Sequence, residues 1–295
     1  MNRQNKMIQG IITKGIGGLY TVTTPEGFAV TCKARGLFRK ENIVPCIGDN
    51  VTVGDNNFIE SIYPRKNILV RPPVANIDYL GIIVSGERPY ADTLMLDKLT
   101  VSAFCMNIEP FVVINKCDIA SSNDIQRIQK HLHGTDIRCI LADCTSENGL
   151  DALKASLQPG VTAFAGQSGV GKTSILSVLL PETKLEVGNL SEKLERGRHT
   201  TRHVELHNIG SGIFIMDTPG FSRYDPEVAD TQQLCGLFPE FTKLSRKCSF
   251  NSCLHIHEPG CAVKEAVENE KLSKTRYENY IKISEQIKTR KAVYK

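Results

Sequence analysis

Residues 166–173 read Gly-Gln-Ser-Gly-Val-Gly-Lys-Thr, a spacing of glycines, lysine and threonine that suits the binding of a phosphate chain. Glycines let backbone N–H groups point at phosphate oxygens beside the N-terminus of a helix, where the helix dipole also favours negative charge. Lys172 can reach the outer phosphates, and the Thr173 hydroxyl can bind Mg²⁺. The residues predicted to hold the phosphates are Gly166, Gln167, Ser168, Gly169, Val170, Gly171, Lys172, Thr173 and Ser174.

An Asn-Lys-Cys-Asp sequence follows the apolar run at residues 111–114 and has the residue types needed to read guanine. The Asp118 carboxylate can accept hydrogen bonds from the ring N–H and the exocyclic amine of the base, Lys116 can lie along the base, and Asn115 can hold the loop together. Adenine presents the wrong edge, and a wrong base leaves buried polar groups unpaired. The predicted base-contacting residues are Asn115, Lys116, Cys117 and Asp118.

Two further segments have the pattern of nucleotide-sensing switches. An apolar strand ending at Asp217 would deliver this carboxylate to the magnesium side of the phosphates, and Gly220 could offer its backbone N–H to the γ-phosphate. Residues 195–206, Glu-Arg-Gly-Arg-His-Thr-Thr-Arg-His-Val-Glu-Leu, form the candidate first switch. Thr201 is the first choice for the threonine that closes over magnesium, and spacing does not separate it from Thr200.

The group that activates water differs from the usual arrangement. Ras-like proteins orient the attacking water with a glutamine just after the second-switch glycine, but here Phe221 follows Gly220. We therefore expect slow intrinsic hydrolysis. His199 is the polar group best placed to orient or deprotonate the water, with an exposed or RNA-contacting histidine as the alternative. His199 and Thr201 are the candidate catalytic residues.

A cluster of soft ligands lies near the C-terminus. The chain has ten cysteines, and three of them join a histidine in the pattern Cys-x4-Cys-x-His-x5-Cys within 14 residues. This suits a closed tetrahedral zinc site with a structural role, because four soft ligands leave no open position. His257 competes with His255 as the fourth ligand, and free thiols are the alternative. The candidate ligands are Cys248, Cys253, His255 and Cys261.

Three consecutive regions of the chain, each with its own sequence pattern, are expected to position these residues. Residues 1–72 contain short alternating strands broken by turns, which suit a small barrel of the oligonucleotide-binding (OB) or SH3-like kind. Residues 73–224 alternate strand and helix, which predicts a parallel α/β sheet with buried strands at 79–85, 111–116, 138–143, 161–166 and 213–218. Residues 225–295 hold the cysteine loop and a basic helical pattern, too small a set for a stable core without zinc.

The order of the motifs is a rotation of the usual one, because the base reader precedes the phosphate loop. Such a rotation is allowed because ligands bind at the carboxyl ends of the strands, which keep their places however the chain is linked elsewhere. Residues 141–150 occupy the position of the second base-contacting loop. That loop usually resembles Ser-Ala-Lys, and here it reads Asp143-Cys144-Thr145.

Charge and hydropathy restrict the class of protein. Of the 295 residues, the first 72 hold ten Lys and Arg against five Asp and Glu, and the last 25 hold eight against two. Basic ends suggest contact with a polyanion, with a solvated surface as the alternative. The start of the chain has no apolar stretch of signal-peptide length, and no run is long enough to cross a bilayer. We expect a cytoplasmic protein without a membrane partner.

Taken in order, NKCD, GQSGVGKTS, GRHTT, DTPGF and CSFNSCLHIHEPGC resemble the circularly permuted GTPases of the bacterial small-ribosomal-subunit assembly family. The resemblance covers nearly the whole chain. It implies a multidomain fold with an N-terminal OB-fold β-barrel that binds RNA (1–72), a central circularly permuted α/β P-loop GTPase (73–224) and a small α-helical zinc-binding domain with a basic C-terminal helix (225–295). It also selects His255 as the fourth metal ligand.

The resemblance further implies an activity and partners. The expected reaction is hydrolysis of GTP to GDP and phosphate, with Mg²⁺ bound beside the nucleotide and one structural zinc per chain. The expected role is late maturation of the small ribosomal subunit, with hydrolysis stimulated by that subunit and with its rRNA as a contact. We expect a monomer. The alternative is a nucleotide-gated RNA-binding protein with little turnover.

Overall fold

The structure is a computed structural model that describes residues 7–41, 43–70, 72–181, 204–217 and 228–293. Contacts between these residues group them into two compact units. The first unit takes its residues from the ranges 1–80, 154–164 and 172–221. The second takes them from 81–153, 165–171 and 222–295. The chain therefore passes between the units several times.

The N-terminal strands form a closed barrel in the order β1-β2-β3-β5-β4. Strand β1 pairs antiparallel with both β2 and β4, while β3 and β5 run parallel. Alternate side chains fill the interior, and Ile12, Val22 and Val51 are fully buried there. The closed five-stranded barrel confirms the expected OB-fold. Its elements are β1 (Ile8–Ile16), β2 (Leu19–Thr23), β3 (Ala29–Ala34), α1 (Gly36–Lys40), β4 (Asn50–Val53) and β5 (Phe58–Ile62), followed by the paired strands β6 (Ile68–Val70) and β7 (Pro73–Ala75).

A six-stranded sheet has the order β10-β9-β8-β11-β13-β12. Five of its strands are those predicted: β8 (Tyr79–Ser85), β9 (Glu109–Asn115), β10 (Arg138–Leu141), β11 (Gly160–Gly166) and β13 (Ile213–Asp217). The sixth, β12 (Glu205–Asn208), was not predicted and pairs antiparallel with β13. It begins inside the segment expected to be the first switch loop. That expectation was wrong for residues 205 and 206, whose backbones pair with those of residues 217 and 216.

Within the described residues, four helices accompany the sheet: α2 (Thr93–Cys105), α3 (Ser122–His131), α4 (Asp151–Ser156) and α5 (Lys172–Leu179). The first two begin at capping side chains. The Asp92 carboxylate accepts from the backbone N–H groups of the first turn of α2, and the Ser121 hydroxyl does the same for α3. Among the described residues, no helix is both long enough and apolar enough to cross a membrane.

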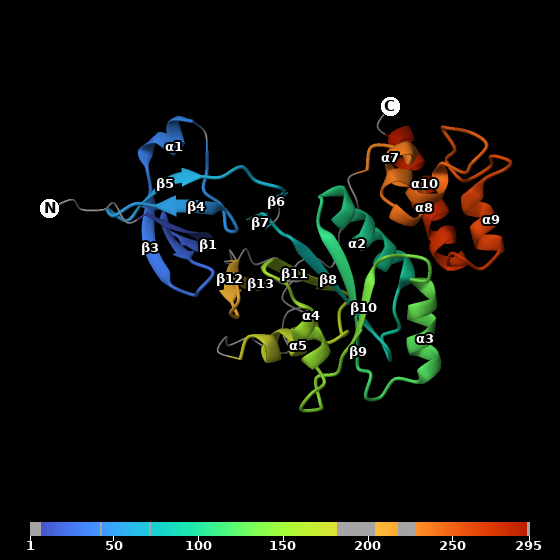
Figure 1. The fold of residues 1–295 in the computed structure, drawn as a ribbon, viewed down its shortest axis with the longest axis horizontal. Coiled ribbons are helices and arrows are strands. Elements are labelled where there is room, and N and C mark those ends of the chain that lie inside the picture. The colour runs from blue at the N-terminus through green and yellow to red at the C-terminus, as the bar shows by residue number, and fades with distance from the viewer. Residues whose placement is uncertain (1–6, 42, 71, 182–203, 218–227, 294–295) are drawn as a thin grey trace. The chain divides into compact units, whose positions relative to one another are not determined.

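The C-terminal part of the chain is helical, with α7 (Thr231–Gly236), α8 (Pro239–Ser245), α9 (Ala262–Glu268) and α10 (Lys274–Val293). Phe238 and Phe241 stack at 4.9 Å between ring centroids, and Tyr280 meets both rings edge-on. Val101 of α2 belongs to the same apolar cluster, and α10 lies beside α2 (Figure 1). The C-terminal helices therefore complete their core against a helix that belongs to the sheet region.

Candidate nucleotide site and metal centre

The phosphate loop lies where the sequence predicts it, between the end of β11 at Gly166 and the start of α5 at Lys172. The buried Asn115 amide donates to the Val170 carbonyl oxygen across 2.9 Å, so the base-reading motif directly holds the phosphate loop. Gly171 has φ of +91°, and a Cβ there would lie 2.2 Å from Asn115 Nδ2. The two motifs are thus parts of one site, as the rotated order requires.

Lys172, Thr173 and Ser174 form the first turn of α5. Burial lowers the pKa of the Lys172 ammonium group below its ordinary value. An anion beside this group acts in the opposite direction, because it favours the charged form. A phosphate chain bound on the loop would therefore stabilise the charged form of Lys172, which burial alone disfavours.

The Asn-Lys-Cys-Asp segment makes a tight turn after β9. Lys116 has φ of +62°, a conformation that side-chain-bearing residues seldom adopt, and its Nζ donates to the Arg88 carbonyl oxygen at 2.7 Å. The Cys117 backbone N–H donates to the Ala142 carbonyl oxygen at 3.2 Å. The Asp118 side chain beyond it is not buried. The turn therefore presents the Asp118 carboxylate at the surface, where a base can reach it.

The candidate second base-contacting loop, residues 141–150, is built around Asp143, a role that the sequence analysis missed. Its Oδ1 atom accepts from the backbone N–H groups of Thr145 at 3.1 Å and Ser146 at 2.7 Å. The Ser146 hydroxyl and then its backbone N–H lower the pKa of the Asp143 carboxyl group. An aspartate that accepts from residues two and three positions later is a known turn signal, so the sequence contained the clue.

The switch residues have a mixed outcome. Asp217 is the last residue of β13, and its backbone pairs with that of Glu205. Gly220 and Phe221 of the second switch, and His199, Thr200 and Thr201 of the first, lie outside the described residues. Their roles at magnesium and at the attacking water stay predictions.

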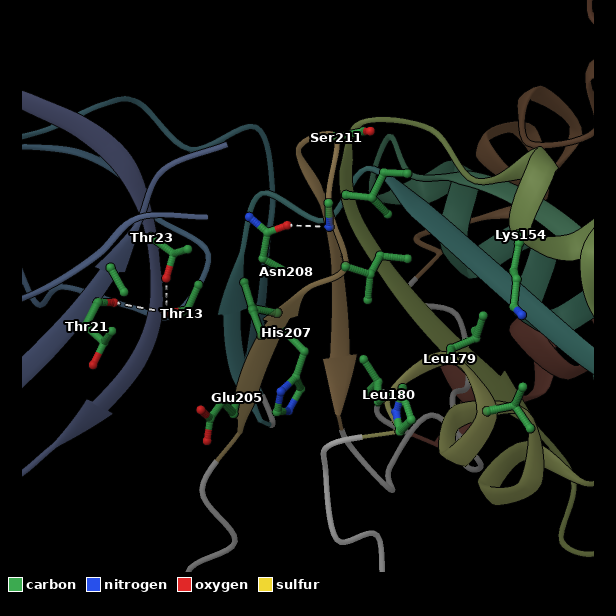
Figure 2. A pocket seen from close by; sticks show the side chains of 17 residues that line it. Thr13, Thr21, Thr23, Lys154, Leu179, Leu180, Glu205, His207, Asn208 and Ser211 are labelled. Carbon is green, nitrogen blue, oxygen red and sulfur yellow. Dashed lines mark hydrogen bonds between the residues drawn. The ribbon is translucent and has the colours of Figure 1, made fainter. Parts of the chain in front are cut away.

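Strand β12 contacts the barrel through two side chains. The Lys14 ammonium group on β1 lies 2.7 Å from Glu205 Oε2, and the Asn208 amide donates to the Thr24 carbonyl oxygen at 3.1 Å. A pocket of about 770 Å³ opens beside this junction, with barrel threonines on one side and the side chains of β12 on the other (Figure 2). A strand that begins inside the candidate first switch, at Glu205, is therefore tied to the barrel.

The four candidate metal ligands come together as predicted. Their sulfur and nitrogen atoms all lie within 4.8 Å of one another, and His255 Nδ1 is 3.2 Å from the Cys261 Sγ atom and 3.7 Å from that of Cys248. Zinc bonds of about 2.3 Å to sulfur and 2.0 Å to nitrogen space tetrahedral ligands roughly 3.5 to 4 Å apart. The set therefore fits zinc. His255 is buried and faces the thiols, whereas His257 is exposed, so the geometry selects His255.

The Cys253 thiol is buried beside a second thiol of the cluster. Burial first, and then the neighbouring Cys261 thiol, raises the pKa of Cys253 to about 12. A coordinated metal reverses the shift and deprotonates the thiols.

Three side chains outside the ligand set shape the metal loop. The Glu258 carboxylate accepts from the backbone N–H groups of Leu254, Ile256 and His257 at 2.9 to 3.1 Å. Burial raises the pKa of Glu258, but these hydrogen bonds outweigh burial and lower it to about 2. From α10, Tyr277 donates to the His255 carbonyl oxygen at 2.7 Å, and Tyr280 donates to that of Leu254 at 2.5 Å. Helix α10 therefore holds the loop that carries the ligands.

The same helix is anchored to α2 by buried charges. Arg276 is 2% exposed, donates to Glu240 at 2.6 Å and also hydrogen-bonds Asp97 of α2, which is fully buried. Asp97 accepts as well from Asn279 at 2.7 Å and lies 3.0 Å from His131 Nε2. Burial lowers the pKa of Arg276, but the two carboxylates outweigh burial and raise it. One of the basic residues that the sequence analysis assigned to a polyanion-binding surface is therefore internal.

Comparison with known proteins shows the family to which the chain belongs. The family model described as RsgA GTPase matches residues 62–227, more than half of the chain, and the RsgA N-terminal domain matches residues 9–61. Curated relatives named "Small ribosomal subunit biogenesis GTPase RsgA" include one from Geobacillus sp. (strain WCH70), 40% identical over 98% of this chain and 100% of its own length. One from Clostridium novyi (strain NT) is 41% identical over 95% of this chain and 97% of its own.

Solved structures give the same result. The crystal structure of YloQ, described as a circularly permuted GTPase, matches with a TM-score of 0.83 and 32% identity over 98% of both chains. That of YjeQ from Thermotoga maritima matches with a TM-score of 0.80 and 31% identity, over 95% of this chain and 98% of that one. The expected OB-fold, permuted GTPase fold and family are confirmed. The chain belongs to the RsgA GTPase family and is a circularly permuted GTP hydrolase.

Proposed function

We propose that this chain hydrolyses GTP during late maturation of the small ribosomal subunit and contacts the rRNA of that subunit. The hydrogen bond from Asn115 to the phosphate loop carries the nucleotide part, because it joins base reader and phosphate loop in one site. The printed names of the curated relatives support the ribosomal part. This role places the protein in the cytoplasm, and we propose that it acts there as a monomer.

We assign a separate role to each of the proposed domains. Residues 1–72 and the basic helix of residues 225–295 would bind RNA, and residues 73–224 would bind and hydrolyse GTP. Both ends carry an excess of basic side chains, which suits contact with phosphate groups. The ion pair between Lys14 and Glu205 connects the barrel to β12, which begins inside the candidate first switch.

Within the nucleotide site, each motif has one proposed role. The backbone N–H groups of residues 166–171 hold the phosphates, Lys172 neutralises them and Asp118 reads guanine. Thr173, Thr201 and Asp217 would hold Mg²⁺, which neutralises charge on the phosphates when it is bound. Gly220 would sense the γ-phosphate, and His199 would orient or deprotonate the water. Zinc on Cys248, Cys253, His255 and Cys261 would be structural, because four protein ligands leave no position for a substrate.

Asp118→Asn is expected to weaken GTP binding by at least about 100-fold and to favour xanthosine triphosphate. An asparagine amide can donate to the additional carbonyl group of xanthine, where the carboxylate could only accept. Equilibrium titration with GTP and with xanthosine triphosphate measures the affinity of the variant for each nucleotide. Asp151→Asn, an exposed aspartate at the start of α4, is the matched control and should bind GTP normally. Unchanged GTP affinity in Asp118→Asn would remove this residue from the base site.

His199→Ala is expected to bind GTP and the small subunit almost normally but to lose most hydrolysis stimulated by that subunit. The reason is that Phe221 cannot accept a hydrogen bond from water, which leaves His199 as the proposed group for this task. Phosphate release with GTP or ATP, with and without small subunits, measures the loss. Lys172→Ala is the control that should lose nucleotide binding itself.

The same assay tests the proposed function. The wild type should release phosphate slowly from GTP, faster with small subunits and hardly at all from ATP. A wild type that small subunits do not stimulate would contradict the proposal and favour a nucleotide-gated RNA-binding protein. Full stimulated turnover in His199→Ala would assign the catalytic group to the ribosome instead.

A further inference from the structure

Strand β12 is a four-residue strand at the edge of the sheet, and the barrel holds it at both ends. Its first residue, Glu205, pairs with Lys14 of β1 at 2.7 Å. Its last residue, Asn208, donates from its amide to the carbonyl oxygens of Thr24 at 3.1 Å and Pro25 at 3.3 Å. Figure 2 shows Glu205 and Asn208 on β12 beside the barrel threonines. An edge strand pairs on one side only, so these contacts add to its support.

The first residue of β12 lies opposite the candidate magnesium aspartate. In the antiparallel ladder, Glu205 pairs with Asp217, the last residue of β13. Hydrogen bonds between the two backbones couple the strands, so the position of one backbone fixes that of the other. We propose that Lys14 is a positioning residue that acts through Glu205 to hold the end of β13 where Asp217 meets Mg²⁺. This inference rests on the proposed role of Asp217 at magnesium.

A bulge in β1 gives Lys14 its direction. Side chains alternate between the two faces of a strand, so a lysine two residues after the fully buried Ile12 would point into the barrel. The register with β2 shifts between Ile12 and Lys14, which leaves Thr13 as an additional residue. The Thr13 and Thr23 hydroxyl groups form a buried hydrogen bond at 2.9 Å that holds the bulge. Bulges re-aim side chains, and the Lys14 side chain is 40% exposed and reaches Glu205.

Contact with RNA is the alternative role for Lys14, because the barrel carries an excess of basic residues. The two roles make different predictions. If Lys14 contacts RNA alone, its substitution has no effect without RNA, and Glu205 is not involved. If Lys14 positions β13 through Glu205, removal of either partner has the same effect on the nucleotide site, and no RNA is needed.

Titration of the full-length protein with a non-hydrolysable GTP analogue, without ribosomes, provides the test. Affinities measured with and without Mg²⁺ give the factor by which Mg²⁺ strengthens nucleotide binding. We expect this factor to fall about twofold to fivefold in Lys14→Gln, the effect of an exposed ion pair, and equally in Glu205→Gln. The double variant should lose no more than either single variant, because both substitutions remove the same ion pair. Lys14→Arg retains the charge and should retain the factor.

Glu109→Gln is the matched control. It breaks an exposed ion pair with Arg138 at 3.2 Å, at the start of β9, which is not a neighbour of β12 in the sheet, and should leave the factor unchanged. Equal weakening of nucleotide binding with and without Mg²⁺ in Lys14→Gln would indicate a general loosening and overturn the positioning role. Additive losses in the double variant, or a loss in Lys14→Gln that Glu205→Gln does not show, would also overturn it.

Asp217→Asn separates this inference from the proposal on which it rests. If Asp217→Asn keeps the wild-type factor, Asp217 does not serve magnesium, and the proposed magnesium site is misassigned. If the factor falls in Asp217→Asn but keeps its wild-type value in Lys14→Gln, Asp217 serves magnesium and the positioning role of Lys14 is wrong.

Discussion

Cys253→Ser is expected to release the metal and to unfold the C-terminal helical part of the chain. Purified wild type should carry about one zinc per chain, and the variant should carry almost none, because a serine oxygen is a poor substitute for a thiolate in this site. Zinc contributes about 10–16 kcal/mol to isolated finger peptides, so losing one of four ligands should cost on the order of 5 kcal/mol here. Metal analysis and urea unfolding followed by circular dichroism measure both effects.

We expect loss of the metal to affect mainly the C-terminal helices and to leave most of the nucleotide binding intact. Tyr277 and Tyr280 of α10 donate to carbonyl groups of the metal loop, so the loop and the helix should loosen together. We expect the affinity for GTP to be affected less than the free energy of unfolding. The metal ligands follow the nucleotide motifs along the chain and belong to a separate loop. Cys139→Ser, an exposed cysteine on β10, is the matched control. A fully folded wild type that contains no metal would refute the zinc assignment.

The features that were predicted from the sequence are local ones. A phosphate loop needs a strand before it and a helix after it, and both are read from adjacent residues. Four of the five predicted strands are largely apolar runs, which is typical of strands buried on both faces, whereas β10 lies at the sheet edge and exposes Cys139 and Leu141. The cysteine cluster is equally local, since its four ligands lie within residues 248–261. In each case the residues that determine the feature lie close together in the sequence.

The features that were missed depend on contacts between distant residues. Strand β12 is short and mixed in polarity, and it exists because its backbone pairs with β13. Asp97 looks like a surface residue in an amphipathic helix, and only its partners on α10 show that it is buried. Arg276 was counted among the basic residues expected to contact a polyanion for the same reason.

Arg276→Met is expected to destabilise the protein by about 3–5 kcal/mol, because it leaves the buried Asp97 and Glu240 carboxylates without their cation. Methionine retains much of the apolar volume that packs on Phe238, whose ring lies 4.8 Å from the guanidinium carbon, so loss of packing adds little. Urea unfolding measures the change. Lys282→Met, an exposed position on the same helix, is the matched control and should change stability by less than about 0.5 kcal/mol.

A double variant identifies the cause of this loss. If uncompensated charge is responsible, Asp97→Asn should remove part of that charge. The loss in free energy of unfolding in the double variant, Arg276→Met with Asp97→Asn, should then be smaller than the sum of the losses in the two single variants. Additive effects would instead assign the loss to packing around Phe238. A wild-type unfolding midpoint in Arg276→Met would show that the buried charges do not hold α10 on α2. The apolar cluster that includes Val101 would then be sufficient to attach the C-terminal helices.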